Sequence, residues 1–131
     1  AERVVCEQPC LGLIDIEILR NGFGSQLDSF KSEAIIKAVS DELIPLTFIR
    51  SPKILRVGTN VKVLLRMDDY IAAAENNSIL VTVFHPELTG CLALHRYFAL
   101  KCGLNPALES SSAVHQSWEN SSWMKLARIA S

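Results

Sequence analysis

The chain has 131 residues and a formal net charge of −1 at pH 7, from 13 lysines and arginines against 14 aspartates and glutamates. This balance argues against nucleic acid as a partner, because phosphate-backbone binding draws on a surplus of positive charge. Hydrophobic residues make up 49% of the chain, which is typical of a globular domain. No apolar run approaches the roughly 20 residues that span a bilayer, so we expect no membrane partner.

Strand patterns dominate the first part of the chain. Leu11–Leu19 alternates isoleucines with Asp15 and Glu17, and this period of two predicts a strand with one polar face. The paired glycines of Asn21–Gly24 predict a turn directly after it.

Two further short elements follow this turn. Ser32–Val39 is predicted to form a short helix. Leu46–Ile49 is apolar and is predicted to form a strand that ends before Pro52, because proline cannot extend a hydrogen-bonded ladder.

The middle of the chain predicts an antiparallel meander. Its three strands are Val61–Leu65, Ile71–Glu75 and Ile79–Phe84. The pairs Asp68-Asp69 and Asn76-Asn77 separate these strands, and such residues favour tight turns.

The period becomes helical after Pro86. Cys91, Leu94, Phe98 and Cys102 share one face of the predicted helix, which should end at Gly103 because glycine readily adopts the left-handed conformation. We expect residues 1–104 to form one domain. Residues 105–131, rich in serine, are expected to be a mobile tail.

The four cysteines are expected to be reduced thiols rather than disulfides. Cys6 and Cys10 lack the CxxC spacing of zinc ribbons and thioredoxin-like sites. Cys91 and Cys102 fall in the predicted helix, where a cysteine usually acts as a small buried hydrophobe. The first residues lack the basic-then-apolar layout of a secretory signal, so we expect a cytoplasmic protein.

The run Val83–Thr89 carries the clearest chemical signal. It reads Val-Phe-His-Pro-Glu-Leu-Thr, an apolar strand that ends in His-x-Glu. His85 would stand at the carboxyl end of this strand, and Glu87 would accept a hydrogen bond from one ring nitrogen and leave the other as a base. By itself this pattern also fits two structural residues. A metal site built from His85, His95 and Cys91 matches no common zinc spacing, and His95 is expected on the helix surface.

Taken together, several segments resemble the class I, triad-type glutamine amidotransferases, and within them the glutaminase subunit of pyridoxal 5'-phosphate synthase. The matching segments run in the family's order over about residues 4–100: Leu11–Ile16, Arg20–Gln26, Asp28–Phe30, Phe48–Pro52 and Phe84–Thr89. The resemblance implies an α/β, flavodoxin-like fold. The Arg20–Gly24 and Leu88-Thr89 segments favour this branch over the histidine-pathway glutaminase.

The resemblance also implies roles for five residues. His85 would be the catalytic base and Glu87 its orienting acid. Arg20 would hold the α-carboxylate of L-glutamine, with Ile49 and Arg50 in the same pocket, although each arginine also fits a solvated surface charge. The implied partner is the synthase subunit, which receives the ammonia. No cofactor and no metal are implied.

The family's nucleophile turn, Gly-x-Cys-Ala-Gly, does not occur in this sequence. We therefore expect the chain to correspond to the C-terminal part of such a glutaminase, without the N-terminal strands and the nucleophile elbow, and to be inactive alone. The alternative is a remnant that binds or regulates the synthase subunit without catalysis. Ser25 stands where the family usually has arginine.

Overall fold

The computed structural model describes residues 1–8, 11–23 and 29–104. The chain divides into two compact units, Ala1–Phe98 and Ala99–Ser131. All elements that carry the candidate site belong to the first unit. The predicted serine-rich tail, residues 105–131, lies outside the described residues, as do Cys10 and Ser25.

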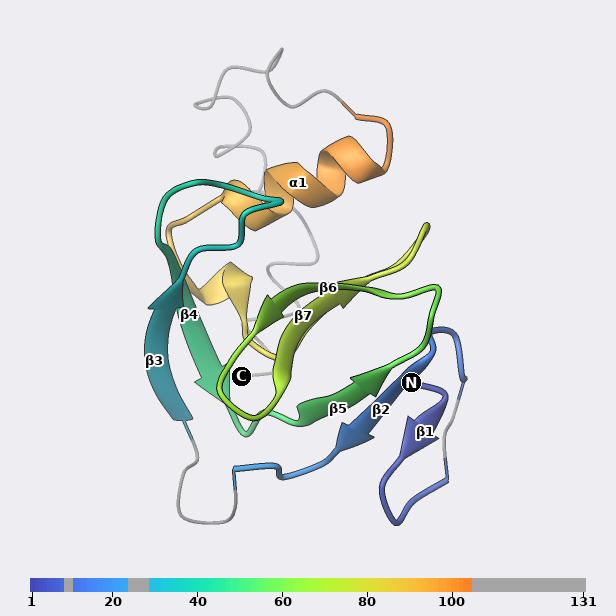
Figure 1. Ribbon diagram of the computed structural model, residues 1–131. Coiled ribbons are helices and arrows are strands. Elements are labelled where there is room, and N and C mark those ends of the chain that lie inside the picture. The colour runs from blue at the N-terminus through green and yellow to red at the C-terminus, as the bar shows by residue number, and fades with distance from the viewer. Residues whose placement is uncertain (9–10, 24–28, 105–131) are drawn as a thin grey trace, which may run out of the picture. The chain divides into compact units, whose positions relative to one another are not determined.

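A mixed sheet forms the centre of the first unit (Figure 1). Five strands follow in the order β1-β2-β5-β7-β6, and β8 also pairs with β7. The β1–β2 pair is parallel and the other pairs are antiparallel. The strands are Arg3–Val4 (β1), Ile16–Leu19 (β2), Lys53–Val57 (β5), Lys62–Arg66 (β6), Ile71–Glu75 (β7) and Leu80–Thr82 (β8).

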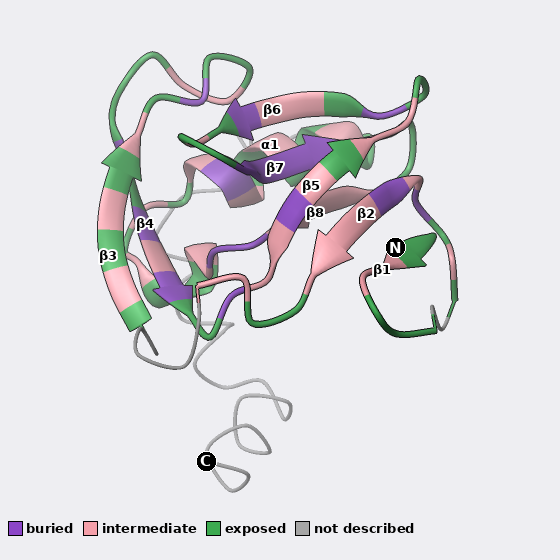
Figure 2. Ribbon diagram, turned by 60° about the horizontal axis from the view of Figure 1, so that its bottom comes forward, coloured by how far each residue is buried: buried purple, intermediate pink, exposed green. Residues whose placement is uncertain are grey.

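The predicted meander is confirmed, since β6, β7 and β8 pair in succession. All five residues of β7 are buried, and Figure 2 shows this strand buried along its length. Its three alanines, Ala72–Ala74, have no exposed surface. β5 was not predicted, because Pro52 indicated only the end of the preceding strand. In the structure Pro52 follows β4 and a new strand begins at the next residue.

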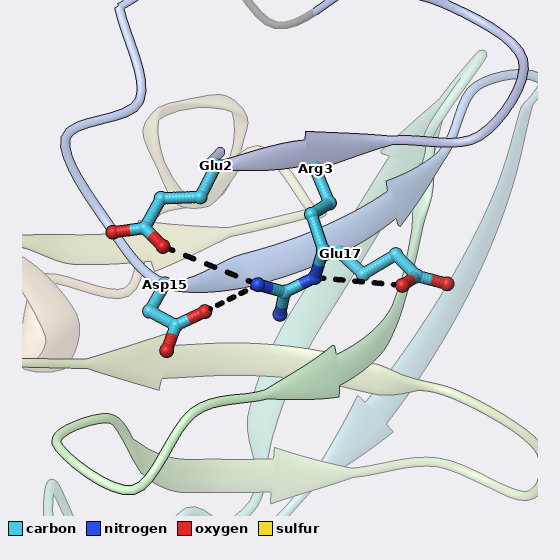
Figure 3. A network of polar contacts seen from close by, with 4 residues as sticks. All are labelled: Glu2, Arg3, Asp15 and Glu17. Carbon is cyan, nitrogen blue, oxygen red and sulfur yellow. Dashed lines mark hydrogen bonds and ion pairs between the residues drawn. The ribbon is translucent and has the colours of Figure 1, made fainter.

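The strand predicted over Leu11–Leu19 is confirmed in its second half, β2. Ile14 and Ile16 are buried, while Asp15 and Glu17 lie on the other face with Arg3 (Figure 3). Arg3 Nη1 donates to Asp15 Oδ1 at 2.7 Å, and Arg3 Nε lies 3.5 Å from Glu17 Oε2. The polar face of β2 therefore pairs with the side chain of β1.

The helix predicted over Ser32–Val39 is wrong. β3 (Ser29–Ala34) instead pairs with β4 (Ile44–Ile49) in a separate two-stranded sheet. Exposure alternates along β3, so its real period is two, and the β-branched Ile35 and Ile36 that follow also disfavour a helix. The strand predicted over Leu46–Ile49 is confirmed and begins two residues earlier.

Helix α1 (Ala93–Lys101) confirms the predicted helix, but not all of its buried face. Leu94 is buried, whereas Phe98 is 43% exposed and Cys102 is exposed. Gly103 ends the helix at φ +82°, as predicted. Leu104 N donates to Ala99 O and Gly103 N to Leu100 O, which is the Schellman pattern.

A partly buried hydrogen bond joins α1 to the sheet. Tyr97 Oη donates to Glu75 Oε1 at 2.6 Å. This bond, together with burial and the negative charge of Glu75, raises the pKa of Tyr97 to about 12. The carboxylate of β7 thus holds the first unit's part of α1 against the strand.

An aromatic cluster packs the β3–β4 sheet against the meander. Phe30 and Phe48 stack at 4.4 Å between ring centroids, and Phe48 meets Phe84 edge-on at 6.0 Å. Phe23 meets Tyr70 edge-on at 5.0 Å. Such pairs contribute beyond the area they bury. Phe48 lies at the centre and is 1% exposed.

Replacing Phe48 by alanine should destabilise the fold severely. Loss of a buried phenylalanine in a packed cluster costs about 3–5 kcal/mol of unfolding free energy. The matched control is Phe98→Ala, which removes a ring that is 43% exposed and should cost about 1 kcal/mol. Urea denaturation of the two variants measures the difference, and equal losses would contradict the central place of Phe48.

Candidate active site

His85 and Glu87 lie where the meander ends. β8 stops at Thr82, and Val83 and Phe84 continue as buried residues before His85. A single 3₁₀ turn, η1 (Pro86–Leu88), follows and is drawn in yellow in Figure 1. Pro86 opens this turn, where its missing N–H leaves no helix bond unmade. The buried Phe84 therefore fixes the chain before His85, and the 3₁₀ turn fixes the chain after it.

Backbone hydrogen bonds hold the motif in place. His85 N donates to Thr47 O of β4 at 2.7 Å, so the end of the meander is tied to the second sheet. On the other side, Thr89 N and Thr89 Oγ1 both donate to Pro86 O, at 3.3 and 3.0 Å. The turn that carries Glu87 is closed at both ends.

The side chains of His85 and Glu87 form a direct pair. Nδ1 of His85 lies 2.7 Å from Oε1 of Glu87. The two side chains are 42% and 56% exposed, so the pair is at the surface of the described residues and half open to solvent. The predicted juxtaposition of base and acid is present in the structure.

The electrostatics of Glu87 determine which ring nitrogen holds the proton. Burial raises the pKa of Glu87, but the hydrogen bond from His85, a backbone hydrogen bond and the charges of His85 and His95 lower it, and lowering wins. An ionised carboxylate only accepts hydrogen bonds, so Nδ1 must be the donor. In the neutral ring Nε2 then carries the free lone pair and can act as a base.

Ile49 and Arg50 follow shortly after Thr47, the backbone partner of His85. Ile49 is the last residue of β4, two positions after Thr47, and is 41% exposed. Arg50 follows with φ +44°, a left-handed conformation that costs free energy for any residue with a side chain. The strained turn places an exposed cation beside the strand that holds His85.

Arg20 lies elsewhere in the sheet, directly after β2. Its Nη1 donates to Glu7 Oε2 at 2.9 Å, and the two side chains are 65% and 47% exposed. Asn21 follows with φ +53°, which marks the predicted turn. Arg20 is therefore held by a carboxylate at the surface.

His95 was expected on the helix surface, and this expectation was wrong for part of its ring. Nδ1 of His95 is buried and has no hydrogen-bond partner among the described residues. The charge of His95 also lowers the pKa of Glu87. No short motif marks this residue in the sequence, since His95 lies eight positions beyond Glu87 and on another element.

The cysteines and possible metal ligands add little to this site. Cys6, Cys91 and Cys102 carry free thiols, and Cys91 is only partly buried. Within the described ranges, no group of three or more histidine, cysteine, aspartate or glutamate side chains is arranged to hold a metal ion. The same part of the chain contains no helix long and apolar enough to cross a membrane.

The fold of this chain is that of the glutamine amidotransferases. A solved structure described as a glutamine amidotransferase matches 79% of this chain and 55% of its own length, with a TM-score of 0.72 and 36% sequence identity. The family model of the SNO glutamine amidotransferases matches residues 2–103. The chain belongs to this family, which confirms both the resemblance and the predicted fold class.

Curated relatives carry one shared name, pyridoxal 5'-phosphate synthase subunit PdxT. The protein of Syntrophus aciditrophicus is 54% identical over 97% of this chain and 57% of its own length. That of Ruminiclostridium cellulolyticum is 51% identical over 68% of this chain and 47% of its own length. The chain thus spans about half the length of the curated relatives it matches.

The His85–Glu87 pair should make stability depend on pH on the acid side. Because folding lowers the pKa of Glu87, its contribution is present above the ordinary glutamate pKa and is lost as pH falls through the lowered value. The stability difference between the wild type and Glu87→Gln should therefore shrink on acidification below about pH 4. Urea denaturation of both proteins at about four evenly spaced pH values between pH 3 and pH 7 measures this stability difference.

The same series in a His85→Ala background serves as the control. Without the imidazole donor, Glu87→Gln should change stability less at neutral pH and show a weaker acid dependence. Parallel curves for the wild type and Glu87→Gln across the acid range would contradict the pair.

Proposed function

We propose that this chain supplies the base and the acid of a glutamine-hydrolysing site. The observation that carries the proposal is the 2.7 Å contact between His85 Nδ1 and Glu87 Oε1 in a chain of a glutamine amidotransferase family. The complete protein hydrolyses L-glutamine to glutamate and ammonia. It delivers the ammonia to the synthase subunit of pyridoxal 5'-phosphate synthase, as the shared name of the relatives suggests.

The reaction needs a cysteine thiol that acts together with His85. Nε2 of His85 takes the thiol proton, and the thiolate attacks the side-chain amide carbon of glutamine. The same proton then passes to the leaving nitrogen, which departs as ammonia and leaves a glutamyl thioester. His85 next removes a proton from water, the hydroxide attacks the thioester, and the thiolate leaves with glutamate as the product.

Glu87 holds the imidazole in the productive orientation throughout. Its ionised carboxylate accepts a hydrogen bond from Nδ1–H and stabilises the imidazolium that forms when Nε2 is protonated. The backbone bond from His85 N to Thr47 O keeps the ring from leaving this position. The nucleophile turn Gly-x-Cys-Ala-Gly does not occur in this sequence. In this proposal, the cysteine thiol therefore comes from outside the segments that hold His85 and Glu87.

Arg20, Ile49 and Arg50 bind the glutamine substrate in this proposal. Arg20 already pairs with a carboxylate, that of Glu7, and a guanidinium of this kind binds an α-carboxylate with the same forked donors. Ile49 offers an exposed apolar side chain beside the strand that holds His85, and Arg50 adds a second cation. The reaction takes place in the cytoplasm and uses no metal or cofactor.

The proposal predicts a large loss of glutaminase activity in the complete protein when His85 is replaced. General acid–base catalysis contributes about 10²–10⁴-fold, so His85→Ala should lower kcat of ammonia release by a factor in that range. The matched control is His115→Ala, which removes a histidine from the serine-rich segment and should leave kcat unchanged. Ammonia release is measured with the synthase subunit present and absent.

A second readout separates catalysis from binding alone. A glutamine-mimicking electrophile should label the wild type and His115→Ala, and label His85→Ala far more slowly. Binding to the synthase subunit without ammonia release in the wild type would refute the proposal and favour a non-catalytic, regulatory role. Ammonia delivered to a histidine-pathway synthase instead would refute the assignment of the partner.

A further inference from the structure

We infer that Lys53 is a positioning residue for Arg20: its side chain holds the turn at residues 20–23 in place, and through that turn it sets the position of the Arg20 guanidinium. The catalytic meaning of this inference rests on the proposed function, in which Arg20 binds the α-carboxylate of glutamine. Its physical content, a turn held by one lysine side chain, is independent of any activity.

Lys53 lies beside the chain directly before Arg20. It is the first residue of β5, and its register partner in the antiparallel β2–β5 pair is Leu19, the last residue of β2. Arg20 follows at once, and Asn21 adopts φ +53° as the chain turns. The register of β2 with β5 ends at the Leu19–Lys53 pair, so other contacts have to keep the turn in its place.

The aliphatic stem of Lys53 packs directly against Gly22 in this turn. A Cβ atom added at Gly22 would lie 2.5 Å from Cγ of Lys53 and 3.0 Å from its Cβ and Cδ. Carbon atoms in contact are ordinarily about 3.5–4.0 Å apart. The lysine stem therefore fills the space in which a side chain at position 22 would stand, and glycine permits this close approach.

The ammonium group of Lys53 holds the next residue of the turn, Phe23. Nζ lies 4.8 Å from the centroid of the Phe23 ring and 5.1 Å from that of Tyr70. Both distances fall within the roughly 6 Å over which a cation is attracted to an aromatic face. The Lys53 side chain is only 15% exposed, and this attraction is stronger where the cation is shielded from water.

Asp69 fixes the direction of the ammonium group. Nζ of Lys53 donates to Oδ2 of Asp69 at 2.8 Å, and this hydrogen bond lowers the pKa of the Asp69 carboxyl group. A largely buried ammonium group without an anion beside it would be costly. Asp69 lies between β6 and β7, so the lysine joins that connection to the turn that follows β2.

The turn held by Lys53 is also packed onto the aromatic cluster. Phe23 meets Phe48 edge-on at 6.1 Å between ring centroids, and Phe48 is the central ring of the cluster that lies behind His85. Lys53 thus contacts the chain on both sides of Arg20 and ties it to the packing that supports the catalytic base.

The test is a steady-state glutaminase assay of the complete protein. Lys53→Met keeps the stem and removes the ammonium group, so the KM for L-glutamine should rise about tenfold with kcat unchanged, which is the mark of lost substrate binding. Asp69→Asn should raise KM by a smaller factor. The matched control is Asp68→Asn, which removes the neighbouring exposed carboxylate and should leave both constants at their wild-type values. Partial unfolding would lower kcat through the amount of active enzyme and would leave KM as it is.

Nitrogen-15 relaxation of the full 131-residue chain measures the hold on the turn without turnover. The backbone order parameters of residues 21–23 should fall in Lys53→Met, from the rigid value of about 0.85 toward about 0.6, and should stay at the wild-type values in Asp68→Asn. The same spectra verify that each variant is folded. If Lys53→Met does not fold, Asp69→Asn against Asp68→Asn gives the same comparison.

Three results would overturn the inference: order parameters in Lys53→Met that equal those of the wild type, a KM that rises in Arg20→Ala but not in Lys53→Met, or a rise in Asp69→Asn that Asp68→Asn reproduces. An unchanged KM in Arg20→Ala would instead refute the substrate role of Arg20 in the proposed function. The relaxation data would then still decide whether Lys53 holds the turn.

Discussion

The candidate site depends on one backbone hydrogen bond, from His85 N–H to the carbonyl of Thr47, at 2.7 Å. His85 comes from the end of the meander and Thr47 from β4 of the other sheet, so this bond joins two sheets at the residue that carries the chemistry. Phe84, one residue before His85, contacts Phe48, one residue after Thr47. Aromatic packing therefore supports the bond from the buried side, which is why a catalytic pair half open to solvent can hold a fixed geometry.

The charge of Glu87 determines which ring nitrogen of His85 carries the proton. Burial raises the pKa of Glu87, but the hydrogen bond from His85 lowers it and the lowering wins. A carboxylate 2.7 Å from Nδ1 then leaves Nε2 as the ring nitrogen with a free lone pair. Arg20 and Arg50, which the sequence predicted to bind substrate, are both exposed. Arg20 has Glu7 as its ion partner. The His85–Glu87 contact is in place in this chain, whereas Arg20 lies elsewhere in the sheet.

The sequence predicted those elements whose pattern lies within a few neighbouring residues. The alternation along Leu11–Leu19, the meander and the His-Pro-Glu turn all follow from residues within a few positions of one another. The helix predicted over Ser32–Val39 failed because pairing with β4, from Ser32↔Leu46 to Ala34↔Ile44, determined the conformation at the start of that segment. Likewise, the burial of Nδ1 of His95 depends on tertiary packing that helical periodicity alone does not encode. Phe98 is the reverse case, an apolar residue on the predicted inner face that is exposed.

The contact with Glu87 fixes the tautomer of the neutral His85 ring, with the proton on Nδ1. Nitrogen-15 NMR of the His85 ring at a pH where it is neutral tests this claim most directly, since the two ring nitrogens have distinct shifts when protonated and bare. The account predicts a proton on Nδ1 and a bare Nε2 in the wild type, and a loss of this preference in Glu87→Ala. A wild-type ring with its proton on Nε2 would contradict the account.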